Sequence, residues 1–215
     1  MKVIIFDMDG VIVDSEYTYL MSKTEILNDL GFDKDESYQY QFMGTTYEYM
    51  WGKMKEDLGL VQPVSYYIKL MNQKRKKLIV NDGVKPIKGV CRFIEELHAN
   101  GFRLAVASSS SRYEIEYNLK ELDLLKKFEV LVSGEEDTSS KPAPDVYLKV
   151  SNLLKISPSE CIAIEDTKNG TVSAAKAGIY TLGFDNPSYP SQDLSSANEI
   201  FNDFISLDID SLKQL

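Results

Sequence analysis

The chain opens with an unbroken apolar run, Val3 to Phe6, which ends at an acidic segment containing a glycine. A β-branched and aromatic run of this length is typical of a strand buried on both faces of a parallel sheet. Similar runs recur after residue 88, at 102–107, 129–132, 161–164 and 180–183, with amphipathic segments of helical length between them. This alternation predicts an α/β fold, a Rossmann-like, doubly wound parallel sheet with helices on its faces.

The segment between the first strand and residue 83 follows a different pattern. It contains no further strand-like run, and 20–30, 46–58 and 64–80 are predicted helices separated by glycine and proline. The sequence therefore predicts a core formed by 1–15 and 84–215 and a helical insert at 16–83. Most of the tyrosines in the chain lie in this insert together with Trp51, and we expect most of them to pack in its core. The cationic run 74–77 is expected to form a solvated helix face.

Composition limits the partners of this chain. Its formal net charge of -9 is spread along the sequence and disfavours binding to nucleic acid or to anionic lipids. Cys91 and Cys161 each lie in an apolar stretch, so we expect two unpaired thiols in a reducing compartment. The sequence shows no signal pattern and no membrane-length apolar run, so we expect a cytoplasmic protein. We expect it to be a monomer or a weak dimer.

Acidic residues follow two of the predicted strands. Asp7 and Asp9 come directly after the first run, and alternation along an extended segment would turn both carboxylates to one side. Gly10 lets the chain turn sharply there. Glu165 and Asp166 end the run at 161–164. Carboxylates gathered at one place need a proton or a cation between them, and an all-oxygen ligand set favours Mg²⁺.

Two further polar groups follow strand ends. The serine run 108–111, which includes Ser108 and Ser109, ends the strand at 102–107 and precedes a predicted helix, a favourable place for an anion. Lys141 precedes Pro-Ala-Pro-Asp145, where the prolines fix the start of another helix. In an open α/β sheet, ligands bind beyond the carboxyl ends of the strands. Taken together, these clusters indicate a phosphoryl-binding site.

The same residues carry a resemblance to a known family. The segment Asp7-Met-Asp-Gly-Val-Ile-Val-Asp14, the serine at 108, Lys141-Pro-Ala-Pro-Asp and Glu165-Asp-Thr-Lys-Asn-Gly resemble the haloacid dehalogenase superfamily in order and spacing. The likeness spans nearly the whole chain. The helical insert resembles the small cap of the β-phosphoglucomutase-like branch.

This resemblance implies a role for each matching residue. Asp7 would attack phosphorus to form an aspartyl phosphate, and Asp9 would protonate the leaving oxygen and then activate water. Mg²⁺ would bind the Asp7 carboxylate, the Asp9 backbone carbonyl and Asp166, with Glu165 assisting. Ser108 and Lys141 would hold the phosphoryl oxygens, and the insert would close over the site as a cap that selects a small phosphorylated metabolite.

The resemblance leaves the acceptor of the phosphoryl group open. Phosphatases transfer it to water and β-phosphoglucomutase to a sugar hydroxyl. The mutase has a histidine where this chain has Tyr19 and an arginine where it has Tyr47, so a phosphatase acting on a small phosphomonoester is favoured. The alternatives are β-phosphoglucomutase and, outside catalysis, a phospho-receiver switch. A receiver also gathers acidic residues, a hydroxyl and a lysine around Mg²⁺, but it needs no helical insert.

Overall fold

The computed structural model describes residues 2–43, 45–136 and 139–215. It divides into two compact units: a sheet unit formed by Met1–Asp14 and Val84–Leu215, and a helical unit formed by Ser15–Gly83. The division falls one residue before the boundary predicted from the sequence.

The sheet unit is built on a parallel sheet of six strands in the order β3-β2-β1-β4-β5-β6. The strands are β1 (Val3–Phe6), β2 (Arg103–Ser108), β3 (Val130–Ser133), β4 (Cys161–Glu165), β5 (Tyr180–Phe184) and β6 (Glu199–Phe201). The first five lie at the predicted runs, and the fold class is confirmed. β6 was not predicted, because a three-residue edge strand with a half-exposed to exposed surface has no continuous apolar signal.

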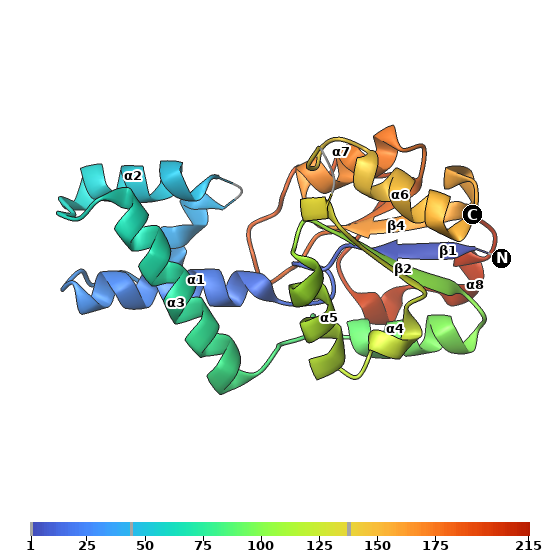
Figure 1. Ribbon diagram of the computed structural model, residues 1–215, viewed down its shortest axis with the longest axis horizontal. Helices are drawn as coiled ribbons and strands as arrows, with labels where there is room; N and C mark the ends of the chain where they lie inside the picture. The colour runs from blue at the N-terminus through green and yellow to red at the C-terminus, as the bar shows by residue number, and fades with distance from the viewer. Residues whose placement is uncertain (1, 44, 137–138) are drawn as a thin grey trace. The chain divides into compact units, whose positions relative to one another are not determined.

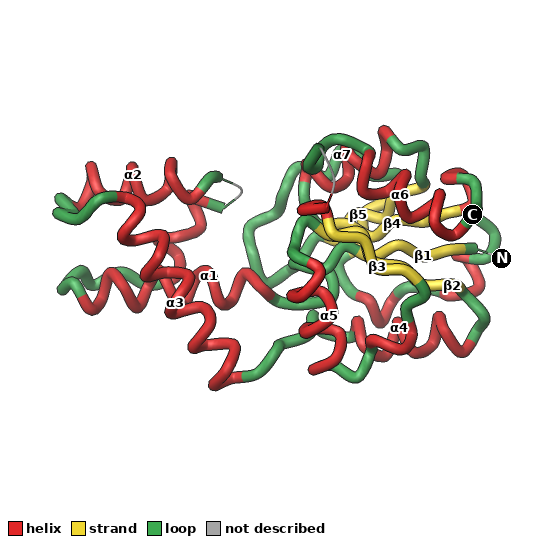
Figure 2. The backbone as a smooth tube through the Cα atoms, viewed as in Figure 1, coloured by secondary structure: helices red, strands yellow, loops and turns green. Residues whose placement is uncertain are grey.

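Helices cover both faces of this sheet, as Figures 1 and 2 show. Ile4 and Phe6 of β1 face the cluster that includes α4 (Val90–Ala99) and α5 (Arg112–Glu121). Val3 and Ile5 face the opposite cluster, which includes α6 (Asp145–Leu154) and α7 (Lys168–Lys176). Alternate residues of one strand are therefore buried on opposite faces, which explains why β1 has no polar position. A short helix, α8 (Ile209–Leu212), lies near the end of the chain.

The helical unit contains α1 (Ser15–Asp29), α2 (Tyr47–Leu58) and α3 (Val64–Asp82), with a 3₁₀ helix at Glu36–Phe42. Its core includes Trp51, which stacks on Tyr67 with ring centroids 5.2 Å apart. The expectation that most of its tyrosines are core residues is wrong, since Tyr67 is the one buried tyrosine among them. The phenol oxygen favours contact with water, and the other tyrosines of the unit are half-buried or exposed.

The predicted cationic helix face is only partly solvated. Lys76 and Lys77 are exposed on α3, as expected. Lys74 instead forms ion pairs with Glu25 and Asp29 of α1, and Arg75 is half-buried.

Within the sheet unit, the segments that lead to and from the helical unit run side by side. Val13 and Pro86 form an antiparallel bridge, and the backbone N–H of Asp14 donates to the carbonyl of Lys85 at 2.8 Å. The hydroxyl of Tyr189 donates to Oδ1 of Asp14 at 2.7 Å. These bonds fix both connections to the same place on the sheet unit.

Two further expectations bear on the chain as a whole. Cys91 and Cys161 are both free thiols, as predicted, although Cys91 is only half-buried. In the described part of the chain, every helix is too short or too polar to cross a bilayer.

The two-faced burial of β1 makes its side chains sensitive to truncation. Ile4→Ala should lower the free energy of unfolding by about 2–5 kcal/mol, because Ile4 has no exposed surface and leaves a cavity in the core. Ile200→Ala on the edge strand β6, where the side chain is 59% exposed, should cost under about 1 kcal/mol. Urea denaturation of both variants measures the difference, and equal losses would contradict it.

Candidate active site

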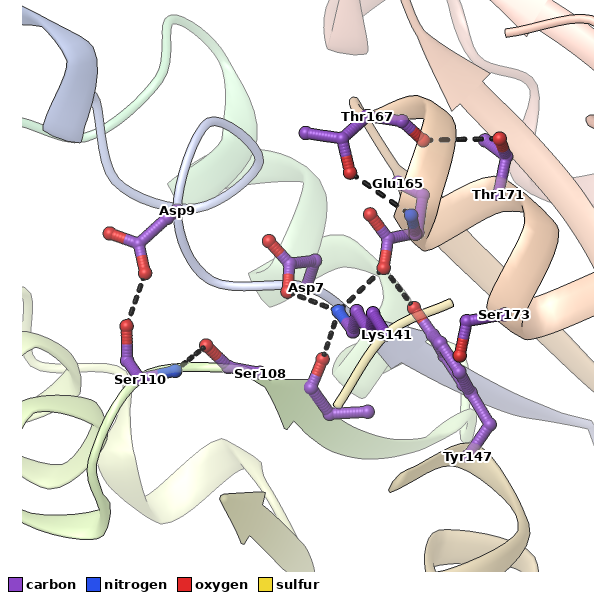
Figure 3. Close-up of polar contacts among 12 residues, drawn as sticks. Asp7, Asp9, Ser108, Ser110, Lys141, Tyr147, Glu165, Thr167, Thr171 and Ser173 are labelled. Carbon is purple, nitrogen blue, oxygen red and sulfur yellow. Dashed lines mark hydrogen bonds and ion pairs between the residues drawn. The ribbon is translucent and has the colours of Figure 1, made fainter. Parts of the chain in front are cut away.

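The ammonium of Lys141 lies at the centre of a polar cluster beyond the carboxyl ends of the central strands (Figure 3). Its Nζ donates to Oδ1 of Asp7 and to Oε1 of Glu165, both at 2.6 Å, and to the carbonyl of Ala107 at 3.0 Å. The strands β1, β2 and β4 are hydrogen-bonded neighbours, so their ends bring these three acceptors together. Lys141 was predicted as a phosphate ligand, and here it binds two carboxylates.

Asp7, Glu165 and Asp166 form an acidic cluster in which one oxygen from each residue lies within 4.8 Å of the others. Glu165 has no exposed surface, and Asp7 is 7% exposed. Within the described residues, Oε2 of Glu165 and Oδ1 of Asp166 are buried without a hydrogen-bond partner. Buried carboxylate oxygens without donors are costly unless they bind a cation. The donor set therefore fits a hard divalent ion such as Mg²⁺.

Two glycines leave space for this cluster. A Cβ at Gly10, which has φ +77°, would lie 1.9 Å from Oδ2 of Asp166. A Cβ at Gly170, in the first turn of α7, would lie 1.8 Å from Oε2 of Glu165. Any other residue at either position would collide with a carboxylate, so the acidic cluster depends on both glycines.

Burial and mutual repulsion change how these groups titrate. Burial, with additional repulsion from Glu165 and Asp9, raises the pKa of Asp7 to about 7 despite the opposing charge of Lys141. Burial and the charges of Asp7 and Glu165 also raise the pKa of Asp166 well above its usual range. For Lys141, burial alone would lower the pKa, but Asp7 and Glu165 outweigh it and the net shift is upward. The lysine therefore stays charged, while Asp7 and Asp166 keep their protons to a higher pH than ordinary carboxyl groups do.

Asp9 has a partner of its own. Its Oδ2 accepts a short hydrogen bond from the hydroxyl of Ser110. Asp9 still raises the pKa of Asp7, so the two carboxylates lie near each other. They do not share a hydrogen-bond partner, because β1 ends at Phe6 and the chain turns at Met8–Val13 instead of remaining extended.

The serines of the run 108–111 differ in burial and in hydrogen bonding. Ser108 is 1% exposed, and its hydroxyl accepts from the backbone N–H of Ser110 at 3.0 Å. Ser109 is exposed and has no hydrogen bond within the residues that the structure describes. Sequence reasoning missed Ser110 as the partner of Asp9, although the serine run itself marked the segment.

Tyr147 is a second residue that the sequence did not single out. Its hydroxyl donates to Oε1 of Glu165 at 2.5 Å, and Nζ of Lys141 lies 5.2 Å from the centre of its ring. Tyr147 has no exposed surface. It lies beside Val146 on the buried side of α6, so in sequence it resembles an ordinary core aromatic. Its position in the first turn after Lys141-Pro-Ala-Pro was the available signal.

Comparison with known proteins gives the family. Residues 4–184 match the model of the haloacid dehalogenase-like hydrolases. The chain is 30% identical over 179 residues to a phosphorylated carbohydrates phosphatase of Thermotoga maritima, covering 83% of this chain and 82% of that protein. It is 27% identical over 188 residues to hexitol phosphatase B of Escherichia coli, covering 83% and 81%.

Among solved structures, a Thermotoga maritima protein with a provisional assignment as β-phosphoglucomutase superposes with a TM-score of 0.83 at 26% identity, over the full length of both chains. The chain therefore belongs to the haloacid dehalogenase-like hydrolases. It is an enzyme of the phosphatase type found in that family.

The raised pKa of Asp7 predicts how stability depends on pH when divalent cations are removed. Relative to Asp7→Asn, the free energy of unfolding of the wild type in EDTA should fall as the pH rises from 5 to 7. Because the pKa rises from 3.8 to about 7 on folding, the folded chain holds a proton that the unfolded chain releases. The stabilisation from the retained proton on Asp7 is complete below the pKa of the unfolded chain. It decreases by roughly 1.4 kcal/mol per pH unit as the pH rises, and it is lost once the pH passes the pKa of the folded chain. Urea denaturation at several pH values measures it, and parallel pH profiles for the two proteins would refute it.

The bond from Tyr147 to Glu165 predicts a stability difference between two tyrosine variants. Tyr147→Phe should lower the free energy of unfolding by roughly 1–3 kcal/mol, because a buried carboxylate loses a donor. Tyr180→Phe is a matched control, since that hydroxyl donates to Glu199 at 2.6 Å in an exposed position, and it should cost under about 1 kcal/mol. Thermal or urea unfolding compares the two, and a loss in Tyr180→Phe as large as that in Tyr147→Phe would contradict this role.

Proposed function

We propose that this enzyme is a Mg²⁺-dependent phosphatase that hydrolyses a small phosphomonoester, a phosphorylated carbohydrate, through an aspartyl phosphate on Asp7. The observation that carries the proposal is the buried cluster of Asp7, Glu165 and Asp166 around Lys141, with Asp9 held separately by Ser110. Two relatives, named phosphorylated carbohydrates phosphatase and hexitol phosphatase B, support the substrate class.

The proposed reaction has two steps. First, a carboxylate oxygen of Asp7 attacks phosphorus, the bond to the sugar oxygen breaks, and Asp9 gives that oxygen its proton. Next, Asp9 takes a proton from water as the water oxygen attacks phosphorus, which releases phosphate and regenerates Asp7. Ser110 holds the Asp9 carboxylate in one orientation for both transfers.

The other residues prepare Asp7 for attack. Asp7 must be ionised, and with a pKa of about 7 it is only partly so near neutrality. A divalent ion held by Asp7, Asp166 and the Asp9 carbonyl, with Glu165 assisting, would supply the positive charge that ionises Asp7 and offsets charge on the phosphoryl group. Lys141 supplies a second, permanent positive charge, and Ser108 and Ser109 are the proposed hydrogen-bond donors to the phosphoryl oxygens. We assign the helical unit the role of a cap that selects the leaving group.

The mutase alternative keeps one observation in its favour, the superposition on the Thermotoga maritima protein assigned as β-phosphoglucomutase. In this chain Tyr19 and Tyr47 lie together, with a hydrogen bond of 2.6 Å from the hydroxyl of Tyr47 to that of Tyr19. A pair of phenols supplies neither the proton exchange of an imidazole near neutrality nor the charge of a guanidinium. This pair therefore favours water as the acceptor.

Phosphorus NMR with Mg²⁺ and a panel of hexose and hexitol phosphates tests the proposal. We expect inorganic phosphate as the product, a loss of at least about 10³-fold in turnover for Asp7→Asn, and a loss of about 10²-fold or more for Asp9→Asn. Ile200→Ala, far from these residues in sequence and exposed, should keep wild-type turnover.

Two outcomes would overturn parts of the proposal. Substantial turnover by a homogeneous Asp7→Asn preparation would exclude the aspartyl phosphate. Conversion of β-glucose 1-phosphate to glucose 6-phosphate in the presence of a trace of glucose 1,6-bisphosphate, without free phosphate, would establish the mutase instead.

A further inference from the structure

The two carboxylate oxygens of Glu165 have different surroundings (Figure 3). Oε1 accepts from Nζ of Lys141 at 2.6 Å and from the hydroxyl of Tyr147 at 2.5 Å. Oε2 is buried and accepts no hydrogen bond from the residues that the structure describes. The side chain therefore has one satisfied oxygen and one oxygen left for a ligand.

The two donors fill the hydrogen-bonding capacity of Oε1. A carboxylate oxygen has about two acceptor sites, and Lys141 and Tyr147 occupy both. Lys141 cannot also replace the tyrosine, because its three N–H groups already serve Asp7, Glu165 and the carbonyl of Ala107. Without the hydroxyl of Tyr147, Oε1 would have an acceptor site open to a cation.

Packing fixes the carboxylate of Glu165 in this orientation. Glu165 and Tyr147 both have no exposed surface. A Cβ at Gly170 would lie 1.8 Å from Oε2 and 2.1 Å from Cδ of Glu165, so the backbone of α7 closes one side of the carboxylate. Turning the carboxylate to present both oxygens to one cation would break the hydrogen bonds to Oε1, which is costly in a buried site.

The number of oxygens that a carboxylate presents affects which cation it prefers. Mg²⁺ requires a near-ideal octahedron of oxygens, whereas Ca²⁺ accepts a larger and less regular set that often includes a bidentate carboxylate. Rigid ligands strengthen this difference, because they cannot adjust to the larger ion. A glutamate restricted to one oxygen therefore suits Mg²⁺ better than Ca²⁺.

We propose that Tyr147 is a positioning residue that restricts Glu165 to one oxygen ligand, Oε2, and thereby favours Mg²⁺ over Ca²⁺. Its hydroxyl acts on the cation through Glu165. The inference rests on the divalent-cation site of the proposed function, and it adds the residue that sets the preference of this site between the two cations.

The cation-dependent stability of the full chain tests this role without substrate. A cation that binds the folded chain raises the thermal unfolding midpoint, and the concentration dependence of the midpoint gives the dissociation constant. Mg²⁺ and Ca²⁺ are titrated separately, at constant pH and ionic strength, into the wild type and Tyr147→Phe. The ratio of the Ca²⁺ constant to the Mg²⁺ constant should fall about tenfold in the variant, since removing the partner of a metal ligand changes affinity by about 10–100-fold. General loosening of the fold would weaken both cations alike and leave the ratio unchanged.

Two further variants complete the design. Tyr180→Phe removes a hydroxyl that donates to Glu199 in an exposed position, and it should leave both constants unchanged. Glu165→Gln should weaken Mg²⁺ binding at least about tenfold, because Lys141 keeps the amide oxygen and the amide nitrogen, a donor, takes the position of Oε2. Adding Tyr147→Phe to Glu165→Gln should not change the ratio further, since a glutamine has no second oxygen to offer.

The outcomes separate this role from the proposed catalytic function. An unchanged ratio in Tyr147→Phe, or an equal change in Tyr180→Phe, would overturn the role of Tyr147. Unchanged Mg²⁺ binding in Glu165→Gln would overturn it too, whatever the stability of Tyr147→Phe. A wild type stabilised by neither cation would overturn both this role and the proposed Mg²⁺ dependence. The expected change of the ratio in a protein without phosphatase turnover would refute the catalytic proposal and leave the role of Tyr147 intact.

Discussion

The arrangement of acidic side chains beyond the central strands depends on the ammonium of Lys141, which binds Asp7 and Glu165. Three carboxyl groups converge beyond strands whose ends are buried, and Lys141 makes short bonds to two of them. One lysine cannot neutralise three carboxylates, so the remaining charge must be removed by protons or by a cation. The parallel register, which sets Phe6 opposite Ile164, brings Asp7 beside Glu165 and creates this demand. The strand pairing thus determines the chemistry of the site as well as the stability of the sheet.

The sequence predicted the sheet well because its central strands are buried on both faces. Val3–Phe6 can contain no polar residue, so its signal is continuous and easily recognised. β6 lies at an edge with Glu199 and Ile200 exposed, and edge strands carry no such requirement. The first turn of α1 was also missed, because Ser15–Tyr19 lacks an apolar periodicity. For the tyrosines of the helical unit the sequence predicted too much burial, since an aromatic residue with a hydroxyl can also lie at the surface.

The grouping of the acidic residues was predictable because carboxylates have few other uses at the end of a buried strand. The cluster of Asp7, Glu165 and Asp166 could be inferred from acidic residues placed directly after buried strands. The pairing of Asp9 with Ser110 could not, because it depends on a turn after β1 that side-chain alternation does not describe. The role of Tyr147 was not predicted for another reason. A buried tyrosine has the sequence pattern of a core residue, and only the structure shows that its hydroxyl donates to Glu165. Side-chain interactions between segments distant in the chain are therefore the part of the site that the sequence alone does not reveal.

The paired connections at Val13–Pro86 and Asp14–Lys85 have a consequence for how such a chain can change over evolutionary time. Since the two segments of the sheet unit that flank the insertion are hydrogen-bonded to each other, they stay together whatever the length of the segment inserted between them. Loop-closure entropy grows only slowly with length, so replacing the insert by a longer, shorter or unrelated segment would cost the sheet little. The two units can accordingly diverge at different rates, with the acidic cluster constrained by strand register and the inserted helices free to acquire new ligands.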